Sequence, residues 1–330
     1  MKPNEIIISE TPFRLPLGGG SSDLPAYYEK YGGFIFGVAV KMYMRILIGR
    51  PFTDDDIHLQ YRKYECESSP DSLKHEICRE ALRMMGIDKK IFISFHADTP
   101  AGTGLGSSGA CAVGLIRGLA TYTGCEIGNL EVAKRAFTLT QNIKLTDGKQ
   151  DPYICALGGF TVLDIARDGK VSVSYPDIKQ ETIDSFFNKT LFFYTGIQRE
   201  SQEILRQQGD EKVLDLKHQI KDIGKKILAC FCDDDLDSFG ELLDKHWEIK
   251  RQMPRTSSEW IEAVYLDAKK AGSLGGKIIG AGGGGYFMFY CPTEKTKTSV
   301  RKKMADAYPL LREIEISADE YGTRARVLTL

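Results

Sequence analysis

Residues 100–110 read PAGTGLGSSGA, and they join a predicted strand, IFISFHA (91–97), to a predicted helix over residues 107–123. Glycines let backbone N–H groups approach a ligand closely, and the start of a helix supplies unpaired donors and partial positive charge. The combination favours a polyphosphate, with the hydroxyls of Ser107 and Ser108 beside its oxygens or a bound metal. The alternative is a tight strand-to-helix connection whose glycines serve only close packing.

Two well-known glycine motifs do not explain this loop. Residues 104–109, GLGSSG, fit the dinucleotide pattern G-x-G-x-x-G, which also needs a second strand ending in an acidic residue about twenty positions later. Residues 124–131, GCEIGNLE, instead indicate a loop entering another helix. The sequence has no G-x-x-x-x-G-K-[ST] segment either, which argues against a P-loop NTPase.

Composition narrows the class of protein. The chain has 44 Lys and Arg against 45 Asp and Glu, so it lacks the basic excess of a nucleic-acid-binding protein. Its 42% hydrophobic and 27% charged residues are typical of globular domains, and no apolar run is long enough for a membrane helix. Eight cysteines without C-x-x-C spacing favour free thiols over a zinc site. We therefore expect a cytoplasmic protein that binds neither nucleic acid nor membrane.

Two further glycine-rich segments flank the central loop. In TPFRLPLGGGSSDL (11–24), Asp23 is either a helix N-cap or a carboxylate for sugar hydroxyls, and Arg14 suits anionic chemistry. In GGKIIGAGGGGY (275–286), four consecutive glycines are costly to order. Something must therefore come very close to that backbone.

The periodicity predicts an α+β protein, with mixed strands and helices first and long amphipathic helices later. We place the domain boundary within residues 176–189, PDIKQETIDSFFNK, which also fits a surface helix. The domains are then 1–185 and 186–330. Strands are expected at 5–9, 34–40, 43–49, 56–61, 91–97, 160–165, 170–175, 190–195, two within 277–290, 311–316 and 324–329; helices are expected at 24–31, 72–86, 107–123, 129–142, 199–208, 211–230, 235–252, 257–270 and 294–307.

Six segments in this order resemble the GHMP kinases, the superfamily of galactokinase, homoserine kinase, mevalonate kinase and phosphomevalonate kinase. Within it, the chain is most similar to bacterial D-glycero-D-manno-heptose 7-phosphate kinases. The resemblance implies a ribosomal protein S5 domain 2-like N-terminal domain, a ferredoxin-like C-terminal domain, and ATP and Mg²⁺ as cofactors. The segments are TPFRLPLGGGSSDLPAYYEKYGG (11–33), HEICREALRMMGI (75–87), PAGTGLGSSGA (100–110), DGKQDPYICALGGF (147–160), LFFYTGIQRESQEIL (191–205) and GGKIIGAGGGGYFMFYC (275–291).

The resemblance also implies roles for individual residues. Asp151 falls at the catalytic aspartate, where a carboxylate orients the acceptor hydroxyl and takes its proton, and Arg14 at a basic position beside the reacting groups. Local sequence alone favours a surface turn for Asp151. Ser108 and Asp151 would hold Mg²⁺. The ATP phosphates would contact Pro100, Gly102, Gly104, Leu105, Gly106, Ser107, Ser108 and Gly109, and the acceptor would contact Gly18, Gly19, Gly20, Ser21, Asp23, Gly282, Gly283 and Gly284.

Two positions depart from the family pattern. Many members carry a magnesium-binding glutamate on a helix before the catalytic aspartate, where this chain has Thr140. Another acid would then replace it, or ATP, Ser108 and Asp151 would hold the metal. Pro152 follows Asp151 where relatives have glutamine, which affects the prediction of the acceptor.

The expected reaction is ATP-dependent phosphorylation of the anomeric hydroxyl of a heptose 7-phosphate by a monomer or homodimer. Its distal phosphate needs a second anion site, for which Lys149 and Arg199 are candidates, unless both are solvated surface cations. The alternatives are another anomeric sugar kinase, such as one acting on L-fucose, and a non-catalytic sugar sensor on the same scaffold.

Overall fold

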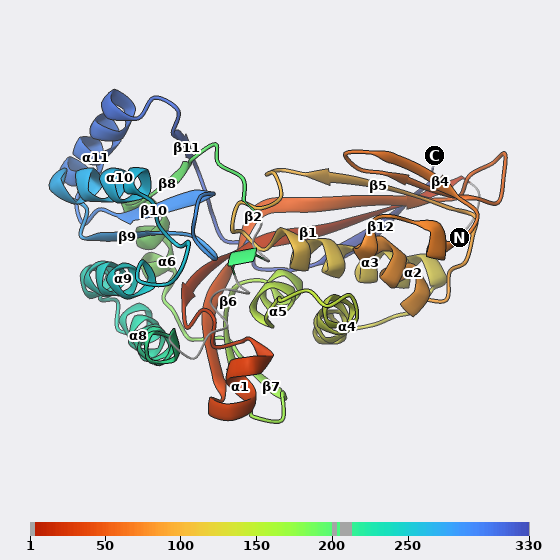
Figure 1. The fold of residues 1–330 in the computed structure, drawn as a ribbon, viewed down its shortest axis with the longest axis horizontal. Coiled ribbons are helices and arrows are strands. Elements are labelled where there is room, and N and C mark those ends of the chain that lie inside the picture. Colours follow the sequence, from red (N-terminus) through yellow and green to blue (C-terminus); the bar gives the residue numbers. More distant parts are fainter. Residues whose placement is uncertain (1–3, 200–202, 205–212, 330) are drawn as a thin grey trace.

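The computed structural model describes residues 4–199, 203–204 and 213–329. It has two parts, each a β-sheet with helices packed against it (Figure 1). The larger sheet has eight strands, seven from the first part of the chain and one from its C-terminal end, and the smaller sheet has four strands from the later part of the chain. This arrangement of helices and sheets confirms the predicted α+β class.

The larger sheet follows the order β12-β1-β2-β5-β3-β4, and β6 and β7 extend it from β2. Most neighbours are antiparallel, as expected, but β3 pairs with β5 in parallel. The sequence did not predict β4, a short strand. The strands are β1 (Glu5–Gly18), β2 (Gly33–Gly49), β3 (Ile57–Gln60), β4 (Tyr64–Glu67), β5 (Ile91–Ala97), β6 (Phe160–Ile165), β7 (Val171–Ser174) and β12 (Arg324–Thr329).

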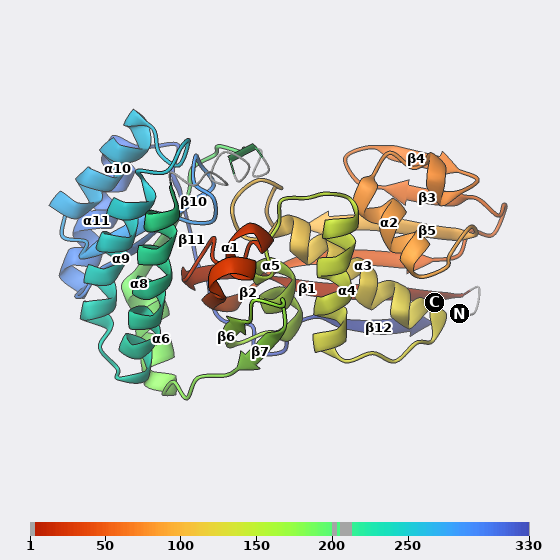
Figure 2. The same ribbon diagram turned by 60° about the horizontal axis from the view of Figure 1, so that its bottom comes forward.

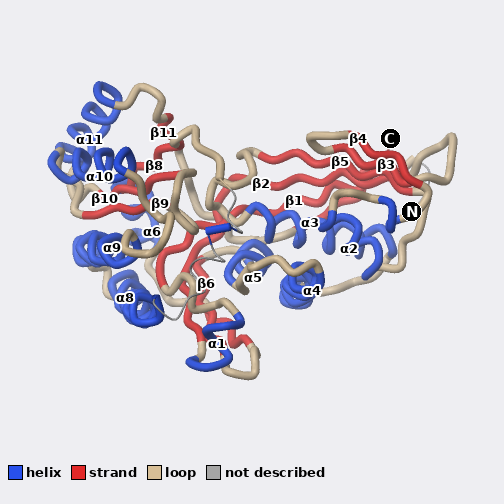
Figure 3. The backbone as a smooth tube through the Cα atoms, viewed as in Figure 1, coloured by secondary structure: helices blue, strands red, loops and turns tan. Residues whose placement is uncertain are grey.

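Strands β1 and β2 are much longer than the sequence predicts, and β2 is one strand where two were expected. Their pairing shifts register between Pro12 and Phe13 and again between Pro16 and Gly18. Such bulges let a strand bend while it stays paired. Both strands therefore bend while they stay in the larger sheet, and β6 pairs with the bent end of β2 (Figure 3).

Four helices cover one face of the larger sheet: α2 (Glu76–Met84), α3 (Ser107–Thr123), α4 (Asn129–Asn142) and α5 (Gln150–Leu157) (Figure 1). Helix α3 lies closest because it presents glycines to the strands. A Cβ at Gly114 would lie 3.0 Å from the Ile46 side chain, and one at Gly118 would lie 2.6 Å from Ile48. These two glycines thus allow α3 to pack closely on β2.

The smaller sheet has the order β11-β8-β10-β9 and carries the later helices (Figure 2). Its core contains the fully buried Trp247, Phe287 and Phe289. Helix α1 (Pro25–Tyr31) lies between β1 and β2 in the chain and does not belong to this part. The elements of the second part are α6 (Gln180–Lys189), β8 (Thr190–Tyr194), α8 (Leu214–Cys232), α9 (Leu236–Lys250), α10 (Glu259–Lys270), β9 (Gly275–Ile278), β10 (Tyr286–Tyr290), α11 (Glu294–Ala307) and β11 (Arg312–Ile314). The helix predicted at 199–208 falls largely on 200–202 and 205–212, outside the described residues.

The last strand returns to the first half of the molecule. Strand β12 pairs antiparallel with β1, so residues 324–329 complete the larger sheet although they lie beyond the proposed boundary at 185/186. The boundary segment itself holds α6, whose Phe186 is fully buried, in agreement with the helical alternative. The division of the chain into domains 1–185 and 186–330 remains our proposal.

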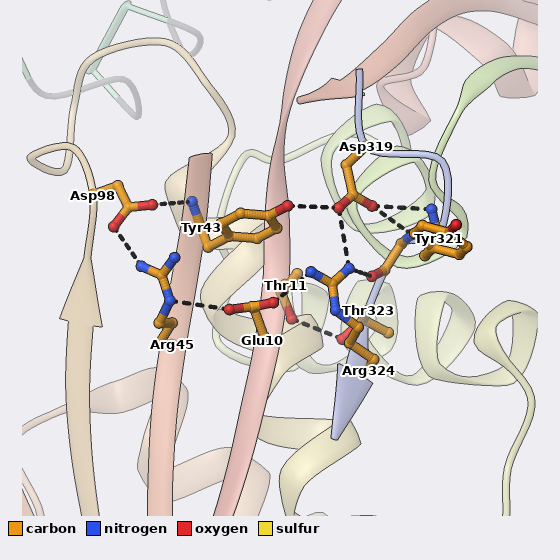
Figure 4. A network of polar contacts seen from close by, with 10 residues as sticks. Glu10, Thr11, Tyr43, Arg45, Asp98, Asp319, Tyr321, Thr323 and Arg324 are labelled. Atoms are coloured by element: carbon orange, nitrogen blue, oxygen red, sulfur yellow. Dashed lines mark hydrogen bonds and ion pairs between the residues drawn. The ribbon is translucent and has the colours of Figure 1, made fainter. Parts of the chain in front are cut away.

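A polar network fixes this return (Figure 4). The buried carboxylate of Asp319 accepts hydrogen bonds from the Tyr43 hydroxyl at 2.8 Å and from Arg324 at 3.0 Å. On the other side of Tyr43, its backbone N–H donates to Asp98 at 2.9 Å. Asp98 lies two residues before Pro100, where the loop of residues 100–110 begins; we call it the glycine loop. The network therefore joins β12 to the start of the glycine loop. No helix in the described part of the chain is long and apolar enough to cross a membrane.

Candidate active site

A cleft lies where the two halves of the molecule meet. Its walls come from the end of β1, the glycine loop, the start of α5 and the helices α8 and α9. The lining residues include Arg14, Gly18, Gly20, Ser21, Asp23, Gly104, Gly106, Ser107, Ser108, Asp147, Gln150, Asp151, Arg199, His246, Lys250, Lys277, Gly280 and Ala281.

Arg14 and Asp151 form an ion pair in this cleft. Nη2 of Arg14 lies 2.7 Å from Oδ1 of Asp151, and Nε donates to the same oxygen at 2.8 Å. Asp151 lies in the first turn of α5, so the surface-turn interpretation of this residue is wrong. Both side chains are largely buried, which strengthens their attraction by excluding water.

The glycine loop passes directly beside this pair. A Cβ at Gly109 would lie 2.5 Å from the Cβ of Asp151, and one at Gly106 would lie 3.1 Å from Cγ of Arg14. Gly102, Gly104 and Gly106 have φ of 77°, 90° and 82°, a backbone region that favours glycine. The glycine loop and the Asp151 carboxylate therefore line the same part of the cleft, as expected for phosphoryl transfer.

The third glycine segment packs on the glycine loop. A Cβ at Gly280 would lie 2.6 Å from Cα of Gly104, and one at Gly285 would lie 2.0 Å from the carbonyl oxygen of Thr103. This confirms the expected close approach of another backbone. The cleft is lined by Gly280 and Ala281, however, whereas Gly282, Gly283 and Gly284 pack against residues 197, 204, 255 and 256.

The first glycine segment has both packing and lining positions. A Cβ at Gly18 would meet Cα of Gly224 at 2.5 Å, and one at Gly19 would meet the carbonyl oxygen of Phe34 at 1.9 Å. Gly20 has no neighbour within 4 Å of a built Cβ, and with Gly18 and Ser21 it faces the cleft.

Asp23 does not cap α1, the helix that follows it in the chain. The N-cap of α1 is Leu24, which makes no side-chain cap hydrogen bond, so the capping interpretation is wrong. Instead, the Asp23 carboxylate accepts the backbone N–H of Gln150 at 2.8 Å, beside Asp151. Burial raises the pKa of Asp23 to about 6. A buried carboxylate in the cleft wall fits the alternative role, binding acceptor hydroxyls.

A second acid lies beside Ser108. The Ser108 hydroxyl donates to Oδ2 of Asp147 at 2.8 Å, and both residues line the cleft. The hydroxyl of Thr140 instead donates to the carbonyl of Phe137, within its own helix α4. Hydroxyl and carboxylate oxygens are ligands suited to Mg²⁺. Asp147 is therefore positioned for the role that Thr140 does not fill, and sequence reasoning missed it because only folding brings it to Ser108.

The two candidate distal-phosphate residues differ in position. The ammonium of Lys149 lies 3.9 Å from the ring centroid of Phe137 and 5.2 Å from that of Tyr28, and Lys149 does not line the cleft. Arg199 does line it, and burial lowers its pKa to about 10. Neither residue is the solvated surface cation of the alternative interpretation. The basic residues His246, Lys250 and Lys277, which the sequence analysis did not single out, also line the cleft.

A second cavity, of about 940 Å³, adjoins the first. It shares Ser107, Ser108 and Arg199 with the cleft, and its wall includes Tyr61 and His75. The rings of Tyr61 and His75 have centroids 4.9 Å apart, and His75 stacks on Phe95. The glycine loop thus separates an aromatic cavity from a charged cleft.

Comparisons with known proteins agree with this geometry. The profile of the GHMP kinases N terminal domain matches residues 73–159, and that of the GHMP kinases C terminal domain matches residues 227–310. The D-glycero-alpha-D-manno-heptose 7-phosphate kinase of Campylobacter jejuni is 29% identical over 88% of this chain and 91% of its own. The crystal structure of a D-glycero-D-manno-heptose 1-phosphate kinase from Bacteroides thetaiotaomicron superposes with a TM-score of 0.80 and 22% identity, over 97% of this chain and 98% of the other.

A third relative supports the alternative function. The L-fucokinase/L-fucose-1-P guanylyltransferase of Bacteroides fragilis is 24% identical over 97% of this chain, which spans 38% of that protein.

A glycine loop at a helix start beside a buried carboxylate is the arrangement typical of a phosphotransferase. Because the two profiles together match more than half of the residues, the chain belongs to the GHMP kinase family, whose members use ATP as phosphate donor. The family and fold expected from the sequence are thereby confirmed.

Proposed function

We propose that this kinase transfers the γ-phosphoryl group of ATP to the anomeric C1 hydroxyl of D-glycero-D-manno-heptose 7-phosphate, giving the 1,7-bisphosphate. The similarity to the Campylobacter jejuni enzyme over nearly the whole of both chains supports this acceptor. Arg199, Lys250 and Lys277 also line the cleft, and basic side chains there favour an acceptor that is itself an anion.

The observation that carries the proposal is the contact between the glycine loop and Asp151. The amides of residues 102–109 would bind a polyphosphate, and the side chain of Asp151 lies against Gly106 and Gly109. An acceptor hydroxyl beside Asp151 would lie in line with the terminal phosphoryl group. Asp151 would orient the hydroxyl and take its proton, while Arg14 would offset the charge that develops in transfer.

Magnesium fits the residues beside the loop. Ser108 and Asp147 would hold it, because their oxygens already converge in the cleft, whereas Asp151 is engaged by Arg14. A bound Mg²⁺ would neutralise charge on the phosphate oxygens. Asp23 would accept hydrogen bonds from acceptor hydroxyls, and Gly20 and Ser21 would bring backbone groups close to the sugar.

An acceptor screen tests the proposal. ADP release is measured with heptose 7-phosphate, free heptose, L-fucose, galactose and mevalonate, and phosphorus NMR locates the new phosphate. We expect turnover with heptose 7-phosphate and a new signal from an anomeric phosphate. Turnover with an unphosphorylated sugar alone would contradict the proposed acceptor.

Phosphorylation of a free anomeric sugar is the second candidate, and the fucokinase relative favours it. The same screen separates the two, because L-fucose carries no phosphate. A sensor without catalytic activity would bind ATP and sugar but release no ADP with any acceptor.

A further inference from the structure

Three basic side chains meet in the part of the cleft that the C-terminal half builds. His246 and Lys250 lie four residues apart on α9, so they share one face of that helix, and Lys277 lies on the neighbouring strand β9. All three line the cleft that holds Arg14 and Asp151. His246 and Lys277 are 3% and 2% exposed.

We call His246, Lys250 and Lys277 the basic cluster, and within the described residues little neutralises it. The Lys277 ammonium donates to the carbonyl of Leu17 at 3.1 Å, and that of Lys250 donates to the carbonyl of Gly280. Among the residues that the structure describes, no carboxylate forms an ion pair with any of the three. Nδ1 of His246 is buried and has no hydrogen-bond partner within the same part of the chain.

Such a cluster is costly to fold without a counter-ion. An ion transferred from water into a protein interior loses solvation worth several kcal/mol unless a partner replaces it. Burial and the nearby charge of Arg14 lower the pKa of Lys277 to about 7. Burial, with the charges of Lys277 and Arg199, also lowers the pKa of Lys250. A bound anion would offset these costs, whereas a neutral ligand would not.

The position of the cluster indicates which anion this is. The triphosphate is expected at the glycine loop, between the cleft and the aromatic cavity. Ser107, Ser108 and Arg199 line both spaces, but His246, Lys250 and Lys277 line only the cleft. Their anion therefore belongs to the acceptor side of the loop.

We infer that His246, Lys250 and Lys277 bind the phosphate group that the acceptor sugar already carries, and thereby select a phosphorylated over an unphosphorylated sugar. The inference rests on the proposed function, because it specifies the substrate class for the same cleft. It replaces Lys149, whose ammonium lies among aromatic rings, with residues that face the acceptor.

The test compares kcat/KM for heptose 7-phosphate with that for free heptose in Lys277→Met and His246→Gln variants. We expect the preference for the phosphorylated sugar to fall by about 10- to 100-fold, the value of one or two charge-assisted hydrogen bonds. Lys245→Met is the matched control, since Lys245 is exposed on the same helix and should keep the wild-type preference. Retention of ATP binding by each variant verifies that it is folded.

A measurement on the unaltered enzyme keeps the inference testable if a variant does not fold. Inorganic phosphate should inhibit competitively against heptose 7-phosphate, and not against ATP. Competition with ATP alone, or an equal loss of kcat/KM for both sugars in the variants, would overturn the inference and place the cluster at the transferred phosphoryl group. The proposed function would survive both of these results. An enzyme that does not phosphorylate heptose 7-phosphate at all would overturn both.

Discussion

Arg14 and Asp151, which are 137 positions apart in the sequence, form an ion pair at 2.7 Å directly beside the glycine loop. Arg14 comes from the bent strand β1, and Asp151 comes from the first turn of α5. The glycines of the loop leave room for both side chains. The site therefore depends on three segments that meet at van der Waals distance, and each can be altered separately.

Asp151→Asn should remove the proton acceptor while keeping the shape of the site. We expect kcat to fall by about 10²- to 10⁴-fold, the usual contribution of a general base, with ATP binding close to wild type. Steady-state kinetics and nucleotide titration measure the two quantities. A variant that keeps most of its kcat would show that Asp151 is not the base.

Gly109→Ala should disrupt the site sterically, because the added methyl would lie 2.5 Å from the Cβ of Asp151. Helix α3 or α5 must then shift, and a displacement of this size in an active site lowers kcat by about 100-fold. Gly128→Ala is the control: its φ is −72° and a Cβ there meets nothing within 4 Å. It should keep full activity and change the free energy of unfolding little, because the smaller entropy of the unfolded chain is offset by the poorer N-cap that alanine makes for α4. Equal activity of the two variants would contradict the packing argument.

Asp147→Asn should weaken the response to Mg²⁺, since it removes the charged partner of Ser108. We expect half-saturation to need about 10-fold more free Mg²⁺, measured as turnover against metal concentration at saturating ATP. Ser108→Ala should act in the same direction. Thr140→Val removes a hydroxyl that bonds within its own helix, and its magnesium response should match wild type. A shift in Thr140→Val but not in Asp147→Asn would reverse the assignment.

Asp23 gives the stability of the protein a pH dependence of known sign. Burial raises its pKa from 3.8 to about 6, so the folded state favours the protonated carboxyl. The contribution of the protonated Asp23 carboxyl to the free energy of unfolding is fully present below about pH 4 and is lost as the pH rises through 6. The side chain of the Asp23→Asn variant stays neutral. Its free energy of unfolding relative to wild type should therefore rise between pH 4 and pH 7, by at most about 3 kcal/mol. Urea unfolding at both pH values measures this, and a pH-independent difference would contradict it.

The same variant separates a binding role from a structural one. Asp23→Asn should raise the KM for the sugar more than the KM for ATP, because a carboxylate accepts more hydrogen bonds from hydroxyls than an amide does. An equal rise in the two KM values would argue against contact with the acceptor.

Asp319→Ala should destabilise the protein strongly, since it leaves the Tyr43 hydroxyl and two backbone N–H groups without their acceptor. We expect a loss of about 2–4 kcal/mol in the free energy of unfolding. Asp306→Ala breaks only the exposed pair with Lys302 and should cost less than about 0.5 kcal/mol. Similar losses in both variants would show that the network of Figure 4 is not a structural tie.

Sequence alone identified the strand–glycine loop–helix unit, the α+β class and the family, because these depend on local chemistry. Glycines at positive φ are needed wherever the loop turns, and the pattern of apolar residues defines α3 whatever packs against it. Arg14 and Ser108 were found in the same way, since each lies within a short glycine-rich motif. Asp151 was identified only through the resemblance to the GHMP kinases, because its local sequence favours a surface turn.

Only the tertiary structure decided how side chains from distant segments combine. It showed that Asp23 lies in the cleft wall and does not cap α1, that Lys149 lies among aromatic rings, and that Asp147 lies beside Ser108. It also gathered His246, Lys250 and Lys277 into one buried basic cluster. No local pattern decides where these side chains lie, because the direction of a side chain is set by long-range packing and the energy of a charge is set by what surrounds it.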